Sequence, residues 1–403
     1  IPDHLHALCN MLGDGLVPSN AKAGYLARML ARRTLRLRDE LNITVSLAEL
    51  AKHHIEVNLG GATMKQTHDG LLGILELEEA RYGEMLRKGG NVINTQLKSL
   101  PKDAVRIPDE ILFNMNDSHG LAPDMAVSLA RRPGWSSVSV RTGFAAEMAE
   151  RDATLAKQAA QAVEVQPLVA GQLTVPATQA LYYDDVQQQQ FDASVLACLP
   201  LIGEDVPDGA THAIVMDKTC FYPEGGGQEG DHGVLSTDSI HCTVLDTRKV
   251  GPHVLHLTNG PFDKGDLVHG SLDWKRRKQL MDHHTAVHIV GGAARRVLGP
   301  HIYQAGANKS VDMARLDITH FHRLTRDDLD AIEALANEVL GQVQRTEKTE
   351  LNRKDADKKY GFDLYQGGAP KGSSIRILRI ADHDIQACGG THHDEPGQIG
   401  SIR

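Results

Sequence analysis

The chain has 403 residues, of which 41% are hydrophobic and 24% charged, and a formal net charge of −9. This length exceeds one ordinary core, so two or three domains are expected, and the negative charge gives no global affinity for nucleic acid. No apolar run reaches the roughly 18 residues that span a bilayer, so no membrane contact is expected. Five scattered cysteines favour a reducing cytoplasm over a disulfide framework.

The first part of the chain has a helical pattern. Apolar residues recur at helical spacing from Pro2 to Val165, and one long predicted helix is interrupted near Gly89 and Gly90. We therefore expect an all-α domain over residues 1–165. Within residues 27–38, three arginines share one helical face that suits a phosphate backbone, namely Arg28, Arg32 and Arg36. An ordinary solvated helix face is an equally good interpretation.

The character changes near Gln166. Short β-branched runs broken by Gly, Pro and Asp predict a small antiparallel barrel or sandwich over residues 166–275. A helix with an apolar stripe, several strands and a helix from Asp327 to Val343 predict an α+β unit over residues 276–403. The predicted fold class is thus multidomain: an all-α helical domain, then a small β-barrel, then an α+β domain.

Two short segments of the last domain predict the metal site. His284 and His288 stand four residues apart on a predicted helix, so their rings share one face. In "ACGGTHHDE", the two glycines indicate a turn that can bring Cys388 and His392 together. Two imidazoles plus a thiolate and a third imidazole form a tetrahedral zinc set. The alternatives are a chance histidine pair in a chain with 21 histidines and a cysteine that is only a buried apolar side chain.

Three motifs also resemble a known family. "HHTAVH", "CGGTH" and "FYPEGGGQ" are similar to the editing domain of the alanyl-tRNA synthetases, and "QAGANKSVDMARLDITHF" is similar to its archaeal type. The helical opening resembles the tRNA-recognition domain of that family. The resemblance, with a first residue Ile1 rather than Met, implies a fragment that lacks both the aminoacylation core and the C-terminal dimerisation region. ATP would then be used only in that missing core, and ligase activity is not expected.

The resemblance implies an aminoacyl-tRNA deacylase: a cytoplasmic proofreading part of an alanine-tRNA ligase. It would hydrolyse Ser-tRNA(Ala) and Gly-tRNA(Ala). A pocket for alanine rejects glycine or serine only about 10- to 200-fold, which explains the need for a second, hydrolytic site.

By the same resemblance, His284, His288, Cys388 and His392 bind one Zn²⁺ per chain. The ion would anchor the substrate, activate water or polarise the ester carbonyl, and a purely structural zinc is the alternative. The editing pocket is expected to contain five further residues: Gln304, Gly226, Gly227, Gln228 and Thr219. Their alternative roles are a polar strand residue for Gln304 and a tight turn for the glycines.

The expected partner is tRNA(Ala), bound at its acceptor stem and 3′ end. The resemblance assigns acceptor-stem recognition to Asn20 and Asp124, and Arg28, Arg32 and Arg36 would contact phosphates. Both Asn20 and Asp124 are also well placed as helix N-caps, which is the structural alternative.

Two other functions compete with proofreading. One is a zinc-stabilised RNA-binding module without catalytic turnover, and the other is a metallohydrolase that acts on small molecules. The basic helix face argues against the second, and the chain has no HExxH motif to supply the general base of a zinc protease.

Overall fold

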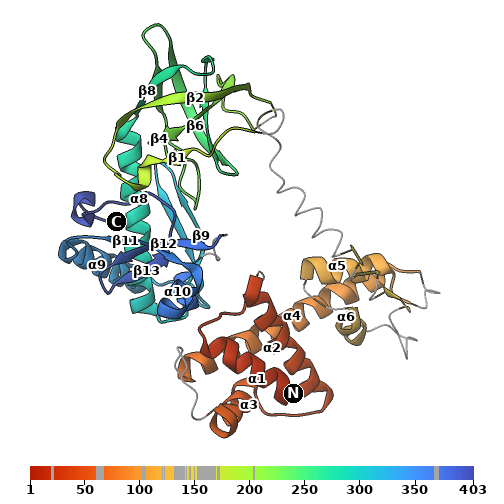
Figure 1. Ribbon diagram of the computed structural model, residues 1–403. Helices are drawn as coiled ribbons and strands as arrows, with labels where there is room; N and C mark the ends of the chain where they lie inside the picture. Colours follow the sequence, from red (N-terminus) through yellow and green to blue (C-terminus); the bar gives the residue numbers. More distant parts are fainter. Residues whose placement is uncertain are drawn as a thin grey trace. The chain divides into compact units, whose positions relative to one another are not determined.

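The computed structural model divides the chain into two compact units, residues 1–165 and residues 166–403. Each unit is described by itself (Figure 1). The structure describes residues 1–19, 22–59, 68–101, 106–119, 121, 123–130, 141, 143–144, 147–148, 150–151, 169, 173–202, 205–366 and 372–403.

The first unit is helical, as the apolar spacing predicts. Its α-helices are α1 (Pro2–Gly13), α2 (Lys22–Glu40), α3 (Leu47–His54), α4 (His68–Lys98), α5 (Asp109–His119) and α6 (Pro123–Leu129), and a π-helical segment (Ile55–Leu59) continues α3. Ser46 and Glu49 form a capping box that starts α3, because each side chain accepts a hydrogen bond from the other residue's backbone N–H.

The arginine face of α2 is turned towards a buried carboxylate of α4. The Nε atoms of Arg28 and Arg32 lie 3.0 and 3.4 Å from Oε1 of Glu78, whose side chain is almost fully buried. Arg36 pairs with Glu40 one turn further along its own helix. The periodicity grouped these arginines correctly, but it could not reveal that a carboxylate from α4 neutralises two of them.

Helix α4 runs without a break through Gly89 and Gly90, contrary to the predicted interruption. A Cβ atom at Gly89 would overlap the side chain of Leu121. The glycine therefore permits close packing instead of ending the helix. Its cost of about 1 kcal/mol relative to alanine is small for a helix of 31 residues that packs along its length.

The second unit begins with a closed antiparallel barrel, one of the two arrangements that the sequence predicts. Its six strands follow the order β2-β3-β7-β6-β5-β8. They are β2 (Gln190–Pro200), β3 (His212–Met216), β5 (Gly233–Ser236), β6 (His241–Val250), β7 (His253–Thr258) and β8 (Leu267–Leu272). Two short strands, β1 (Gln179–Ala180) and β4 (Lys218–Thr219), pair in parallel beside it. Alternating side chains fill the interior, among them Phe191, Val195, Ile214, Phe221 and Leu235.

A neutral histidine is sealed inside the barrel. His256 Nδ1 lies 3.0 Å from the Ile214 carbonyl oxygen and Nε2 lies 2.8 Å from Thr219 Oγ1. Nδ1 therefore donates to the carbonyl, and Nε2 accepts from the threonine hydroxyl. Burial lowers the pKa of His256 to about 4.

This burial predicts an acid-sensitive barrel. Because the folded pKa lies below the unfolded value of about 6.5, protonation favours unfolding as pH falls from 6.5 towards 4. We expect the free energy of unfolding to fall by up to about 1.4 kcal/mol per pH unit from this group. His256→Gln should be less stable at pH 7 but should lose less stability on acidification. Urea unfolding between pH 4 and 7 measures both slopes, and parallel slopes would contradict the prediction.

The remainder of this unit combines one long helix with two small sheets. Its helices are α8 (Trp274–Leu298), α9 (Arg326–Gln342) and α10 (Arg353–Tyr360), with 3₁₀ turns at Leu181–Tyr183, Phe362–Leu364 and Pro396–Ile399. A hairpin joins β9 (Gln304–Lys309) to β10 (Ala314–Ile318), and a three-stranded sheet has the order β11 (Glu347–Asn352), β12 (Ser374–Ile380), β13 (Asp384–Ala387). Ile289 and Ala293 of α8 share one hydrophobic core with residues of α9 and β12, which fixes α8 beside the sheet.

Among the described residues, no helix combines the length and the apolar character that a membrane crossing requires. The structure thus has a helical N-terminal region followed by antiparallel sheets with helices packed on them.

Candidate metal centre and adjoining cavity

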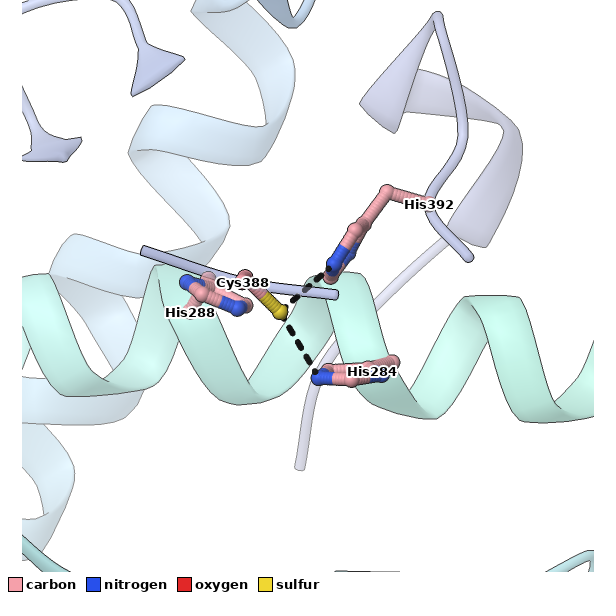
Figure 2. Close-up of side chains that lie close together, drawn as sticks. All are labelled: His284, His288, Cys388 and His392. Atoms are coloured by element: carbon pink, nitrogen blue, oxygen red, sulfur yellow. Dashed lines mark hydrogen bonds between the residues drawn. The ribbon is translucent and has the colours of Figure 1, made fainter. Parts of the chain in front are cut away.

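Four side chains from two distant segments converge at the middle of α8. His284 and His288 lie one turn apart on this helix, with ring centroids 5.5 Å apart and nearly parallel planes. Cys388 and His392 come from the turn that follows β13 (Figure 2). Gly390 lies between them, and a Cβ atom there would overlap the ring of His284. Glycine is therefore required for the turn to approach the helix this closely.

The distances fit a tetrahedral metal ion. Cys388 Sγ lies 3.2 Å from Nε2 of His392 and 3.5 Å from Nε2 of His284, and one ligand atom from each of the four residues falls within 4.8 Å of the others. Zinc bonds of about 2.3 Å to sulfur and 2.0 Å to nitrogen place tetrahedral ligands about 3.5 Å apart. The four residues can therefore hold a zinc ion with little movement.

The outward-facing nitrogen of each imidazole has a polar neighbour. Nδ1 of His284 lies 2.7 Å from Gln228 Oε1, and Nδ1 of His288 lies 2.9 Å from Asp384 Oδ2. Nδ1 of His392 lies 3.5 Å from Thr285 Oγ1. Such partners fix the tautomer and turn Nε2 towards the centre, as in most protein metal sites.

The electrostatics favour the ligating forms of two histidines and the cysteine. Burial lowers the pKa of His284 to about 4 and that of His392 well below its usual range, so both rings are neutral. Burial acts to raise the pKa of Cys388, but the three imidazoles outweigh it and hold this pKa well below the usual value. Burial lowers the pKa of His288, yet the Cys388 thiolate and Asp384 raise it to about 9. A bound metal would require the neutral ring of His288, so binding at this site releases protons.

A cavity of about 590 Å³ opens beside this cluster. Its walls include aromatic rings of Tyr182 and Tyr222, the glycine loop at Gly225 and Gly226, and β9 from Gln304 onwards. Tyr183 Oη donates to the Gly389 carbonyl oxygen at 2.7 Å.

Arg376 supports the same turn. It stacks on the Tyr183 ring, 4.6 Å from its centroid, and donates to the Cys388 and Gly390 carbonyl oxygens. The turn that carries Cys388 is therefore held in place from outside the cavity.

The residues that the sequence analysis assigned to a pocket fall into two groups. Gln304 and Gly226 line the cavity. The backbone φ angles of Gly226 and Gly227 are 60° and 75°, and a Cβ at Gly227 would overlap the Ala307 carbonyl, so both positions favour glycine. Within the described part of the chain, neither Thr219 nor Gln228 contributes to the cavity wall. Thr219 bonds to His256 inside the barrel, and Gln228 faces the metal cluster.

The structure describes only some of the residues that the sequence analysis assigned to tRNA binding. Asn20 lies outside the described residues, and Asp124 is the second residue of α6 with a side chain that is also outside them. Arg28 and Arg32 pair with Glu78, as described above.

Several residues of the site escaped the sequence analysis, among them Lys309 and Asp384. Lys309 is 1% exposed, lines the cavity and donates from Nζ to the Gly226 carbonyl oxygen at 2.7 Å. Asp384 stands behind His288. Metal-binding histidines commonly have a carboxylate partner. A search for an acidic residue near the predicted ligands would therefore have identified Asp384. A lone lysine in a polar strand gives no comparable signal.

Comparison with known proteins places the chain in a family. The family model described as tRNA synthetases class II (A) matches residues 1–276. The chain therefore belongs to the class II (A) tRNA synthetases.

Its relatives point to one member of that class. The chain is 42% identical to the alanine–tRNA ligase of Pyrococcus furiosus over 407 residues and 42% identical to that of Thermococcus kodakarensis over 410 residues. It is 40% identical to the alanine–tRNA ligase of Halobacterium salinarum over 405 residues. These alignments cover all of this chain but only 42–43% of each relative. The chain thus spans less than half the length of the relatives that it matches.

The family match corrects two expectations from the sequence. The aminoacylation core that the sequence analysis expected to be missing is present, because the class II family model matches residues 1–276. The assignment of the chain to an editing hydrolase without ligase activity is therefore wrong. Two of the three motifs behind that assignment, "HHTAVH" and "CGGTH", lie beyond residue 276 and carry no information on the matched segment.

Proposed function

We propose that this chain works as part of an alanine–tRNA ligase and takes part in attaching alanine to tRNA(Ala). The observation that carries the proposal is the similarity of the entire chain to archaeal alanine–tRNA ligases, together with the class II family match. Ester formation from a free carboxylate is uphill in water, so the reaction uses ATP to activate the amino acid. The partner is tRNA(Ala), with its acceptor stem and 3′ end as the contacted parts.

We also propose that the chain binds one Zn²⁺ ion, with His284, His288, Cys388 and His392 as its ligands. The support is the approach of their four ligand atoms to within 4.8 Å of one another. Four protein ligands close a tetrahedral shell, so the ion serves as a cross-link between α8 and the 388–392 turn and as a fixed positive charge beside the cavity. Asp384 and Gln228 orient two of the ligand rings.

The ligase proposal is tested with the purified chain, tRNA(Ala), alanine and ATP. We expect preferential binding of tRNA(Ala) over an unrelated tRNA, alanine-dependent ATP–pyrophosphate exchange, and formation of alanyl-tRNA(Ala). Exchange reports activation of alanine without tRNA, so it separates the two steps of the reaction.

The outcomes are distinct. Absence of exchange and charging, at protein concentrations that saturate tRNA(Ala), would overturn the ligation part and leave tRNA binding. Equal affinity for both tRNAs would overturn the binding part. Both measurements should be made at two salt concentrations, because phosphate contacts weaken steeply with salt.

A further inference from the structure

Gln228 lies between the cavity wall and the four candidate metal ligands. It ends the glycine loop that begins at Gly225, and its side chain is completely buried. Its Oε1 accepts hydrogen bonds from His284 Nδ1 at 2.7 Å and from Thr391 N at 3.2 Å, while its Nε2 donates to Thr391 Oγ1 at 2.8 Å. One amide thus contacts both segments that carry the metal-binding side chains.

The same loop is held from its other side by β9. Lys309 donates from its backbone N to the Gly227 carbonyl oxygen at 2.6 Å and from Nζ to the Gly226 carbonyl oxygen at 2.7 Å. Gly225 and Gln228 close the loop through reciprocal backbone hydrogen bonds of 3.1 and 3.0 Å. The loop therefore forms a well-supported part of the cavity wall. Gln228 connects it to the four candidate metal ligands.

We infer that Gln228 is a positioning residue that couples metal binding to the wall of the cavity. Its carbonyl oxygen holds His284 as the tautomer whose Nε2 faces the ion, and its contacts with Thr391 fix the residue before His392. A bound ion therefore adds to the hydrogen bonds that hold the loop at Gly225–Gln228, through this one amide, and loss of the ion loosens that wall. The inference rests on the zinc site proposed above and goes beyond the ligand set.

The chemistry of the side chain indicates which replacements preserve the role. Glutamate has the same length and its carboxylate accepts from both N–H groups, while the Thr391 hydroxyl can rotate and donate to it. Leucine has a similar size but removes every hydrogen bond. Asparagine keeps the amide but is shorter by one methylene, so it does not reach His284 in the same position.

The first measurement is zinc affinity, by competition with a chromophoric chelator. We expect Gln228→Leu to weaken zinc binding about 10- to 100-fold, the usual cost of losing an outer hydrogen-bond partner. Gln228→Asn should fall between leucine and wild type, and Gln228→Glu should bind zinc about as tightly as the wild type. A matched control is Gln366→Leu. Gln366 is another buried glutamine, bonded to the backbone of Gln304 and Asp363, and its loss should not change zinc affinity.

The second measurement is hydrogen exchange, first in the wild-type chain and then in Gln228→Leu. Hydrogen exchange of the amides at 225–229 should accelerate when zinc is removed from the wild-type chain, whereas in Gln228→Leu it should be fast with or without zinc. Exchange in the barrel strand β7 serves as the internal reference.

The results separate this inference from the zinc proposal. A wild-type chain that binds no zinc would overturn the zinc site itself. If Gln228→Leu and Gln228→Asn bind zinc as tightly as the wild type does, the positioning role of Gln228 is overturned. Should the leucine variant fail to fold, exchange in the wild type decides: a loop unaffected by zinc removal overturns the coupling.

Discussion

Replacing Cys388 by alanine is expected to abolish zinc binding at ordinary protein concentrations. Cys388 supplies the only anionic and the only sulfur ligand of the four, and its thiol is held in the thiolate form by the surrounding imidazoles. Three neutral imidazoles would leave the double charge of the buried ion without an anionic ligand, with only the Asp384 carboxylate behind His288 to offset it. We expect affinity to drop by more than about 100-fold, the upper end of the cost of losing an outer partner alone.

Metal analysis of the purified variant and competition with a chelator measure this effect. The matched control is Cys220→Ala, because Cys220 is buried in the barrel and burial raises its pKa to about 12. Its thiol is therefore neutral, and its removal should leave zinc binding unchanged. The helical unit, whose described residues contribute no ligand to the cluster, should keep its circular dichroism in both variants. Equal zinc content in the two variants would contradict the assigned ligand set.

The second large effect is expected at a buried ion pair that joins the barrel to α8. Arg277 and Asp231 are 0% and 1% exposed, and Arg277 Nε lies 3.0 and 2.9 Å from the two carboxylate oxygens. Arg277 also donates to the Cys220 carbonyl oxygen at 2.6 Å, and Asp231 accepts from the backbone N of Tyr222 at 2.6 Å. Arg277→Met should cost about 3–5 kcal/mol, because it leaves a carboxylate buried without its cation.

Hydrogen exchange of barrel and α8 amides in increasing urea measures this loss separately from the helical unit. The double variant Arg277→Met, Asp231→Asn should be more stable than the single variant, because the asparagine is neutral and still accepts from Tyr222. The control is Arg326→Met, which breaks an exposed pair with Asp330 on α9 and should cost less than about 1 kcal/mol. A similar loss of unfolding free energy in Arg277→Met and Arg326→Met would show that the buried ion pair does not specially stabilise the contact between the barrel and α8.

The sequence analysis predicted that the side chains of His284, His288, Cys388 and His392 lie together, as the structure shows. A spacing of four on a helix puts His284 and His288 on one face whatever surrounds them. Glycines between Cys388 and His392 give a turn for an equally local reason. The change from helical to strand periodicity near Gln166 was likewise visible in the spacing of apolar residues.

Motif resemblance was less reliable for the activity. The motifs identified the family correctly, since the relatives of the chain are alanine–tRNA ligases, but the inference of an editing hydrolase that lacks the aminoacylation core was wrong. The class II family match over residues 1–276, together with the similarity of the whole chain to alanine–tRNA ligases, corrected that inference.

The sequence by itself therefore determined features that depend on neighbours within about one helical turn: which histidines share a face, where a turn lies, and where helices give way to strands. The tertiary structure decided which partner each polar group meets. Glu78 of α4 neutralises Arg28 and Arg32, and Gln228 turns away from the cavity towards His284. The physical reason is that a buried charge or amide must be satisfied by whatever group the fold brings within about 3 Å, and that group is often distant in the chain.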